Sequence, residues 1–179
     1  MSAPRIKLVG ISLACLVAAG AFAGVARSLF TPAWSYLPAA SRAQLARQQG
    51  GSLFLPARTP LFYRYRSGAK VTNGVLSVPF TNRVRIRKGL WRWTGQSFVW
   101  QVRKLPAATT CDQWATRTQT FQVDGNKVFG AMTPTGSVAW RCVTNAHGTY
   151  VLSASNGSKL PAVGLAIVVA SGLDVSHRR

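Results

Sequence analysis

The chain has 179 residues, of which 22 are Lys or Arg and only three are acidic, giving a formal net charge of +19. All three acids are Asp, and so small a number of acids disfavours catalysis by paired carboxylates, calcium loops and most magnesium sites. A charge of this size attracts anionic surfaces, so the partner is expected to be anionic. The protein itself is expected to have no enzymatic activity, cofactor or metal.

The first 26 residues have the pattern of an export signal. Arg5 and Lys7 precede Leu8–Ala26, a stretch of 19 residues without a charge. Small residues near its end predict cleavage before Gly24. Alternatively the stretch is retained as a transmembrane anchor, because 19 residues just cover a bilayer of about 30 Å. Both alternatives place the remainder of the chain outside the cytoplasm, either anchored in the membrane by residues 8–26 or secreted.

Two cysteines follow the signal segment, and the sequence predicts that they form a disulfide. Cys111 and Cys142 are an even pair in an exported domain, where disulfides persist. Closing a loop of about thirty residues would stabilise the fold by about 3 to 4 kcal/mol. The alternatives are a catalytic thiol with His147 as base, or a serine triad with His147 and Asp112. No local catalytic motif accompanies either alternative, so no catalytic residue is assigned.

Residues 27–59 have the composition of a tether, with Pro32, Pro38 and Pro56 along it. A short helix is expected over Ala39–Gln49. Leu45 is its only large aliphatic residue, so we expect it to be solvated rather than packed on a core. The domain is therefore expected to occupy residues 60–179.

From residue 61 onward, short alternating runs between turn dipeptides predict antiparallel strands. Asn73-Gly74 and Asp124-Gly125 each separate two such runs, and the second pair predicts a type I′ hairpin. The expected strands include Leu61–Arg66, Val75–Phe80, Arg83–Arg87, Ser97–Lys104, Ser137–Val143 and Tyr150–Ala154, with two more flanking Asp124-Gly125.

One of these runs has an unusual pattern of charge. Arg83, Arg85 and Arg87 alternate with Val84 and Ile86. The period of two places three guanidinium groups on one face and the aliphatic side chains on the other. The pattern predicts a half-buried strand with a basic outer face.

The last segment predicts a helix. Pro161 stands where a first helical turn would begin, and the uncharged run to Leu173 is too short to span a membrane. The predicted fold class is therefore α+β, mainly β, with a single antiparallel sheet of six or seven strands and a C-terminal helix packed on it.

The order of these landmarks resembles a family of extracytoplasmic sensor-like domains found on bacterial anti-sigma factors and envelope lipoproteins. A Pro-rich opening over residues 55–63 precedes a hairpin at Val123–Val128 and a Trp strand at Val138–Trp140. A strand with the spacing G-x-Y-x-L and a closing helix that ends in Ala-Ser follow. The resemblance implies an envelope domain that senses or binds, and it carries no catalytic residue.

The candidate binding site combines cations with indole rings on the predicted central strands. Such a surface suits an anionic component of the cell envelope: lipid headgroups, a wall polymer or an acidic protein domain. Nucleic acid is the alternative partner, and a hydrolase with an unrecognised site is the third hypothesis. Equally, the rings could be core residues and the arginines a solvated face that prevents edge pairing. The candidate residues are Arg64, Arg66, Arg83, Arg85, Arg87, Lys88, Trp91, Arg92, Trp93, Arg103 and Lys104.

Overall fold

The structure, a computed structural model, describes residues 30–32, 37–60, 62–65, 67–107, 109, 119–156 and 160–176, the first three by their backbone only. The expected signal or anchor segment lies outside these residues. Among the helices that are described, none has both the length and the apolar character needed to cross a membrane.

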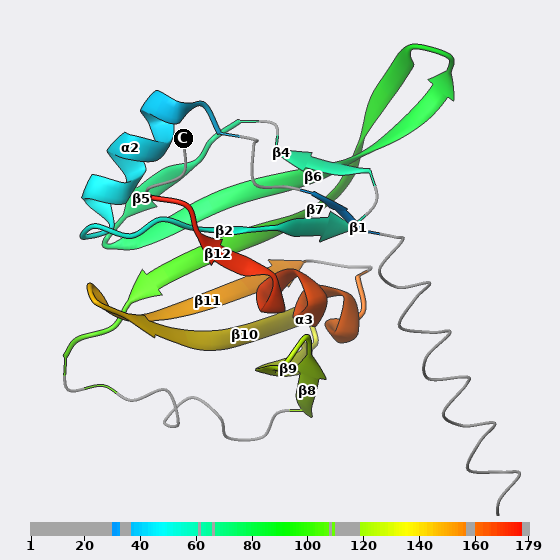
Figure 1. The fold of residues 1–179 in the computed structure, drawn as a ribbon. Helices are drawn as coiled ribbons and strands as arrows, with labels where there is room; N and C mark the ends of the chain where they lie inside the picture. The colour runs from blue at the N-terminus through cyan, green and yellow to red at the C-terminus, as the bar shows by residue number, and fades with distance from the viewer. Residues whose placement is uncertain are drawn as a thin grey trace, which may run out of the picture.

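Eight antiparallel strands form one sheet in the described part of the chain (Figure 1). The strand order is β4-β6-β7-β11-β10-β9-β8, and β5 pairs with β6 on the same side as β4. The predicted antiparallel sheet is confirmed, with one strand more than the six or seven expected. The expected runs Val75–Phe80 and Arg83–Arg87 form the single strand β6, and the short strand β5 was not expected. The strands are β4 (Tyr63–Tyr65), β5 (Lys70–Thr72), β6 (Val75–Arg87), β7 (Leu90–Lys104), β8 (Gln119–Val123), β9 (Asn126–Thr133), β10 (Gly136–Asn145) and β11 (Gly148–Asn156).

Two of the hairpins have the expected turns. Asn73 and Gly74 have φ values of 50° and 72°, and Asp124 and Gly125 have values of 49° and 76°. Two consecutive residues at positive φ are the mark of a type I′ turn, whose twist matches that of the strands it joins. The prediction at Asp124-Gly125 is therefore confirmed.

The predicted C-terminal helix is also confirmed. Helix α3 (Ala162–Ala170) contacts β9, β10 and β11 on the same side of the sheet. It is shorter than expected, because the chain turns at Ser171 into strand β12 (Gly172–Asp174), which pairs with β2 (Phe54–Pro56). A further small pair joins β1 (Phe30–Pro32) to β3 (Arg58–Pro60).

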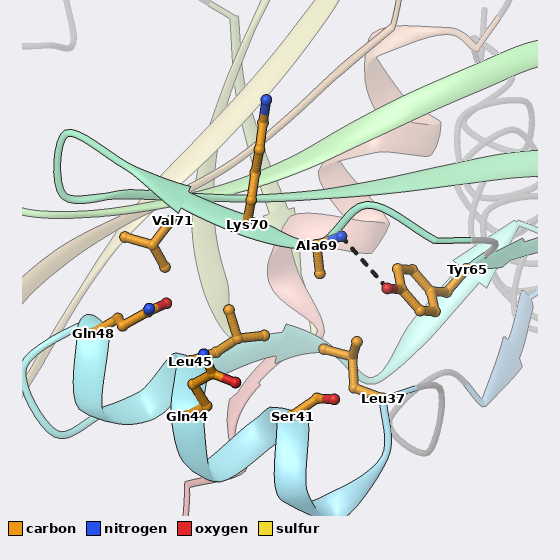
Figure 2. A pocket seen from close by; sticks show the side chains of 9 residues that line it. All are labelled: Leu37, Ser41, Gln44, Leu45, Gln48, Tyr65, Ala69, Lys70 and Val71. Carbon is orange, nitrogen blue, oxygen red and sulfur yellow. Dashed lines mark hydrogen bonds between the residues drawn. The ribbon is translucent and has the colours of Figure 1, made fainter.

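The expected tether over residues 27–59 is wrong for residues 37–59, which belong to the domain. Leu53, Phe54 and Leu55 are each no more than 3% exposed and join the same core as the sheet. The expected helix forms as α2 (Ala39–Gln48), but it is not solvated, because Leu45 packs toward β5 (Figure 2). The weak amphipathic pattern follows from this arrangement, since α2 buries only Leu45 and Ala46 along its length.

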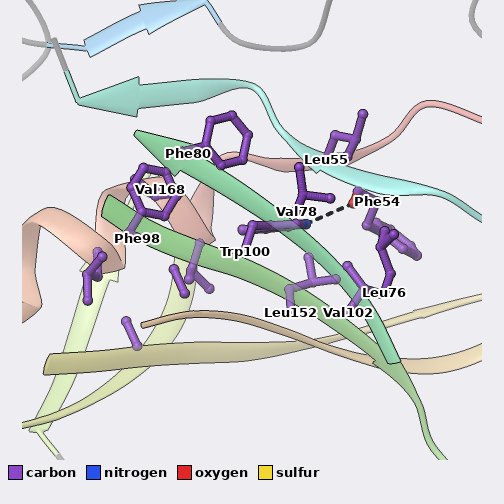
Figure 3. Close-up of a cluster of buried hydrophobic side chains, with 14 of the residues drawn as sticks. Phe54, Leu55, Leu76, Val78, Phe80, Phe98, Trp100, Val102, Leu152 and Val168 are labelled. Carbon is purple, nitrogen blue, oxygen red and sulfur yellow. Dashed lines mark hydrogen bonds between the residues drawn. The ribbon is translucent and has the colours of Figure 1, made fainter. Parts of the chain in front are cut away.

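The core lies between the sheet and a layer made of α2, β2 and α3. Trp100 is completely buried at its centre, and its indole N–H donates a hydrogen bond to the carbonyl of Phe54 at 3.0 Å (Figure 3). Phe80 and Phe98 stack beside it with their ring centroids 4.9 Å apart. The bond from Trp100 satisfies the only polar atom of the indole and fixes β2 over the sheet.

A single carboxylate ties this layer to the end of the sheet. Oδ1 of Asp174 accepts hydrogen bonds from the N–H of Leu53 at 3.3 Å and from the hydroxyl of Ser176 at 2.7 Å. Oδ2 accepts from the amide of Asn145 at 3.1 Å. Burial raises the pKa of Asp174, but bonds from Ser176, Ser52 and Leu53 outweigh this effect and hold its pKa below the usual 3.8.

Replacing Asp174 with Asn should make the stability of the protein less dependent on pH. Because the pKa of Asp174 is lower in the folded state, its carboxylate stabilises the protein above about pH 4, and this stabilisation is lost as the pH falls through the folded pKa. We expect D174N to cost about 1 to 3 kcal/mol at pH 7. Urea unfolding from pH 7 to pH 2 should show the difference from the wild type shrinking below pH 4. A constant difference would contradict this role.

Candidate functional site

The far halves of β6 and β7 form a two-stranded arm that extends past the rest of the sheet (Figure 1). Nearest to the arm, the residue of β6 that still pairs with β4 is Asn82, and the residue of β7 that still pairs with β11 is Phe98. Beyond these points the two strands pair only with each other in the described structure. We call residues 83–93 the arm. It contains five cations and no acid.

The register of the arm separates its side chains onto two faces. Arg83 lies opposite Trp93, and Arg85 lies opposite Trp91, so these four side chains share one face. We call this the indole face. The predicted stripe of arginines is therefore confirmed for Arg83 and Arg85, and the opposite strand adds two indole rings to it.

The other face of the arm carries its aliphatic side chains, together with Arg92. Val84 lies opposite Arg92, and alternation places Ile86 and Leu90 on the same side. We call this the aliphatic face. A register shift between Arg85 and Arg87 pairs Arg87 with Leu90, so the prediction that Arg87 continues the arginine stripe is wrong.

The prediction of a half-buried strand is also wrong. Val84, Ile86 and Leu90 are 37%, 54% and 43% exposed. An alternating pattern predicts burial on the aliphatic side only where a second layer covers that side, and the core beneath β6 and β7 ends at Phe80 and Phe98. The aliphatic side chains of the arm are therefore on the surface, between cations.

An aromatic stack braces the root of the arm. The guanidinium carbon of Arg83 lies 4.6 Å from the centroid of the Trp91 ring. The ring of Phe62 lies 5.9 Å from Trp91, tilted by 46°. The carbonyl of Phe62 accepts a hydrogen bond from the N–H of Arg83 at 3.0 Å. One face of the Trp91 ring is therefore already occupied within the protein.

Phe62 has an unfavourable backbone conformation at this position. Its φ is 72°, in the left-handed region that a bulky side chain adopts rarely and at a cost of about 1 to 3 kcal/mol. Its ring is 41% exposed, so burial of the side chain in the core does not offset that cost.

The pairing between β6 and β7 contains an irregular step next to Phe62, at the root of the arm. Between Thr81 and Arg83 the register shifts, so that more residues of β7 than of β6 occupy this step. Asn82 holds it together, since its amide donates to Gln96 at 3.2 Å and its carbonyl accepts from the hydroxyl of Thr94 at 3.1 Å. The arm is thus joined to the sheet through a bulge rather than a regular ladder.

The remaining candidate residues fall into separate places. Arg64 lies at the root of the arm, opposite Thr81, and its guanidinium donates to the carbonyl of Tyr63 at 2.8 Å. Arg103 and Lys104 lie at the opposite end of β7 and line an open hollow of about 640 Å³ with the end of α2. Arg66 lies outside the described residues. The eight candidate cations that the structure describes therefore do not form one patch.

The cations and indole rings of the arm were among the residues singled out from the sequence, but the exposure of its aliphatic residues and the contacts of Phe62 with the arm were not foreseen. Val84 and Ile86 have the pattern of core residues, and Leu90 follows a turn without further signal. One feature of the sequence could have indicated that these aliphatic residues are exposed: Arg92 interrupts their side of the hairpin, so no strand face between residues 83 and 93 is wholly apolar.

The residues proposed as alternatives for catalysis are not assembled in the described structure. Cys142 is in a disulfide and is therefore not a free thiol, while its expected partner Cys111 and the acid Asp112 lie outside the described residues. His147 is exposed in the turn between β10 and β11, where its backbone N–H donates to the side-chain oxygen of Asn145 at 2.9 Å. No group of three or more metal-binding side chains occurs among the residues described.

A second hollow, of about 310 Å³, separates α2 from β5 (Figure 2). It is lined mainly by neutral side chains such as Gln44, Gln48 and Tyr65, whose hydroxyl accepts a hydrogen bond from the N–H of Ala69. Among the described residues that line it, Lys70 is the only cation. Its chemistry does not match the anionic partner that the charge of the chain predicts.

No known protein family, no curated protein and no solved structure shows significant similarity to this chain. The resemblance to extracytoplasmic sensor-like domains therefore stays a prediction from the sequence.

Proposed function

We propose that this protein is a non-enzymatic protein of the cell envelope whose arm binds the surface of an anionic lipid bilayer. One observation carries the proposal: a projecting hairpin exposes three aliphatic side chains among five cations and has no acid. Interfacial binding needs these two contributions together, namely apolar area that leaves water and cations that meet lipid phosphates.

The two faces of the arm favour this partner over nucleic acid. Single-stranded nucleic acid stacks its bases on open aromatic faces, and Arg83 already covers one face of Trp91. Val84, Ile86 and Leu90 offer no stacking surface, but they suit the boundary between headgroups and acyl chains. The charges of Arg87, at the end of β6, and Lys88, in the turn, disfavour entry of the tip, so we expect the arm to lie flat with its aliphatic face toward the lipid.

The proposed orientation agrees with the expected localisation. If residues 8–26 anchor the chain or direct its export, the domain operates outside the cytoplasm and close to a membrane surface. The arm would then hold the domain against that bilayer, or against a second bilayer.

Replacing Ile86 and Leu90 with Ser tests the proposal. The full chain is held in zwitterionic nanodiscs, so that segment 8–26 is already in lipid, and its binding to separate anionic liposomes is measured. Each half-exposed aliphatic side chain should contribute about 1 kcal/mol, so we expect I86S/L90S to bind about 30-fold more weakly. Binding of the wild type should persist in part at high salt, since the apolar contribution is not screened.

Hydrogen exchange locates the contact. Anionic liposomes should slow exchange in peptides that cover residues 83–93, and neutral liposomes should not. Met132→Ser is a matched control, because Met132 is 71% exposed and lies on β9, away from the arm. Weak binding to liposomes, together with binding to single-stranded DNA that falls steeply with salt, would overturn the proposal in favour of nucleic acid.

A further inference from the structure

We infer that Phe62 is a positioning residue, which fixes the angle of the arm by holding Trp91 and Arg83. The inference rests on the proposed function for its lipid-binding readout, whereas the rigidity of the arm can be measured without lipid. Phe62 lies one residue before β4, which is the last strand beside β6 before the arm begins.

The junction between the arm and the sheet needs such support. At Asn82 the ladder is interrupted by the bulge that contains Thr94 and Gln96, and beyond it neither outer edge of the hairpin is paired in the described structure. A two-stranded ribbon without a core is marginally stable by itself. Contacts that cross this junction therefore determine how firmly the arm is held.

Phe62 makes two such contacts. Its carbonyl bonds the N–H of Arg83, which is the first residue of the arm, and its ring lies against Trp91 on the other strand. Arg83 in turn lies over the Trp91 ring. One residue outside the hairpin thus contacts both of its strands.

The backbone of Phe62 supports a role other than packing. A glycine would adopt a φ of 72° without strain, yet this position carries a large ring that stays 41% exposed. Strained residues persist where the surrounding structure holds them for a reason. The brace is on the indole face, so it leaves Val84, Ile86 and Leu90 open on the other face.

The test uses a series of substitutions at residue 62. Phe62→Ala and Phe62→Gly remove the ring, and glycine also removes the backbone strain. We expect both to raise hydrogen exchange of the arm amides about tenfold without lipid. We also expect both to weaken binding to anionic liposomes about tenfold. Phe62→Tyr keeps the ring, so the hydrogen exchange of the arm and the binding to liposomes should both stay near those of the wild type. The melting temperature of F62G should stay near that of the wild type.

A double mutant separates positioning from direct contact with lipid. If Phe62 acts through Trp91, F62A should weaken binding no further in a W91A background. An equal further loss in that background would mean that Phe62 touches the lipid itself, which would overturn the inference. Unchanged exchange of the arm in F62A and F62G would also overturn it. If exchange rises as expected but the wild type does not bind liposomes, the proposed function fails while the positioning role stands.

Discussion

Neutralising four cations of the arm is expected to weaken binding to anionic liposomes about a thousandfold. Each Lys or Arg near an anionic bilayer contributes about 1 kcal/mol, so four contribute about 4 kcal/mol. The variant replaces Arg85, Arg87, Lys88 and Arg92 with Gln. These side chains are exposed, so the free energy of unfolding should change little. Binding of nanodisc-held protein to liposomes with increasing anionic lipid content measures the effect.

A matched variant with the same net charge is the control. Arg47, Lys70, Arg103 and Lys127 are also exposed, and they lie on α2, β5, the far end of β7 and β9, respectively, rather than on the arm. Replacing these four with Gln removes the same charge from the protein. We expect less than a tenfold loss, because charges beyond a Debye length of about 8 Å from the lipid are screened. Equal losses in the two variants would show that overall charge, and not the arm, binds the bilayer.

Replacing Trp100 with Ala is expected to have the largest effect on stability. The side chain is completely buried and bonds the carbonyl of Phe54, so its removal leaves a cavity and an unpaired acceptor. Large-to-small changes of this kind cost about 3 to 5 kcal/mol, which is a large part of the stability of a domain of this size. Urea unfolding followed by circular dichroism measures the loss.

Trp140→Ala is a useful comparison, because Trp140 lies on β10 and is only partly buried. We expect it to cost clearly less than W100A, since less of its surface leaves water on folding. If W100A unfolded at the same urea concentration as the wild type, the buried indole would not be the centre of the core.

The elements of the fold that depend on local sequence could be predicted. Asn73-Gly74 and Asp124-Gly125 set their turns because Asn, Asp and Gly tolerate the positive φ values that a type I′ turn requires. Phe98, Trp100 and Val102 alternate within the expected strand Ser97–Lys104, so they share one face, and all three are fully buried. These features depend on residues within a few positions of each other.

The features that depend on distant partners were missed. Helix α2 has little amphipathic character, and its place in the core follows from contacts of Leu45 that no local pattern shows. Val84 and Ile86 alternate as Leu76 and Val78 do, yet the first pair is exposed and the second buried. The difference is the layer above them, which covers β6 only as far as Phe80.

The sequence by itself determined the charge, the antiparallel strands, their turns and the closing helix, because composition and short-range periodicity carry that information. Only the tertiary structure decided which cations act together. The lengths of β4 and β11 end the sheet at Asn82 and Phe98 and leave β6 and β7 to continue alone. That ending turns an alternating strand into an exposed arm with two distinct faces. It also separates Arg103 and Lys104 from the arm, because the two ends of one long strand lie far apart.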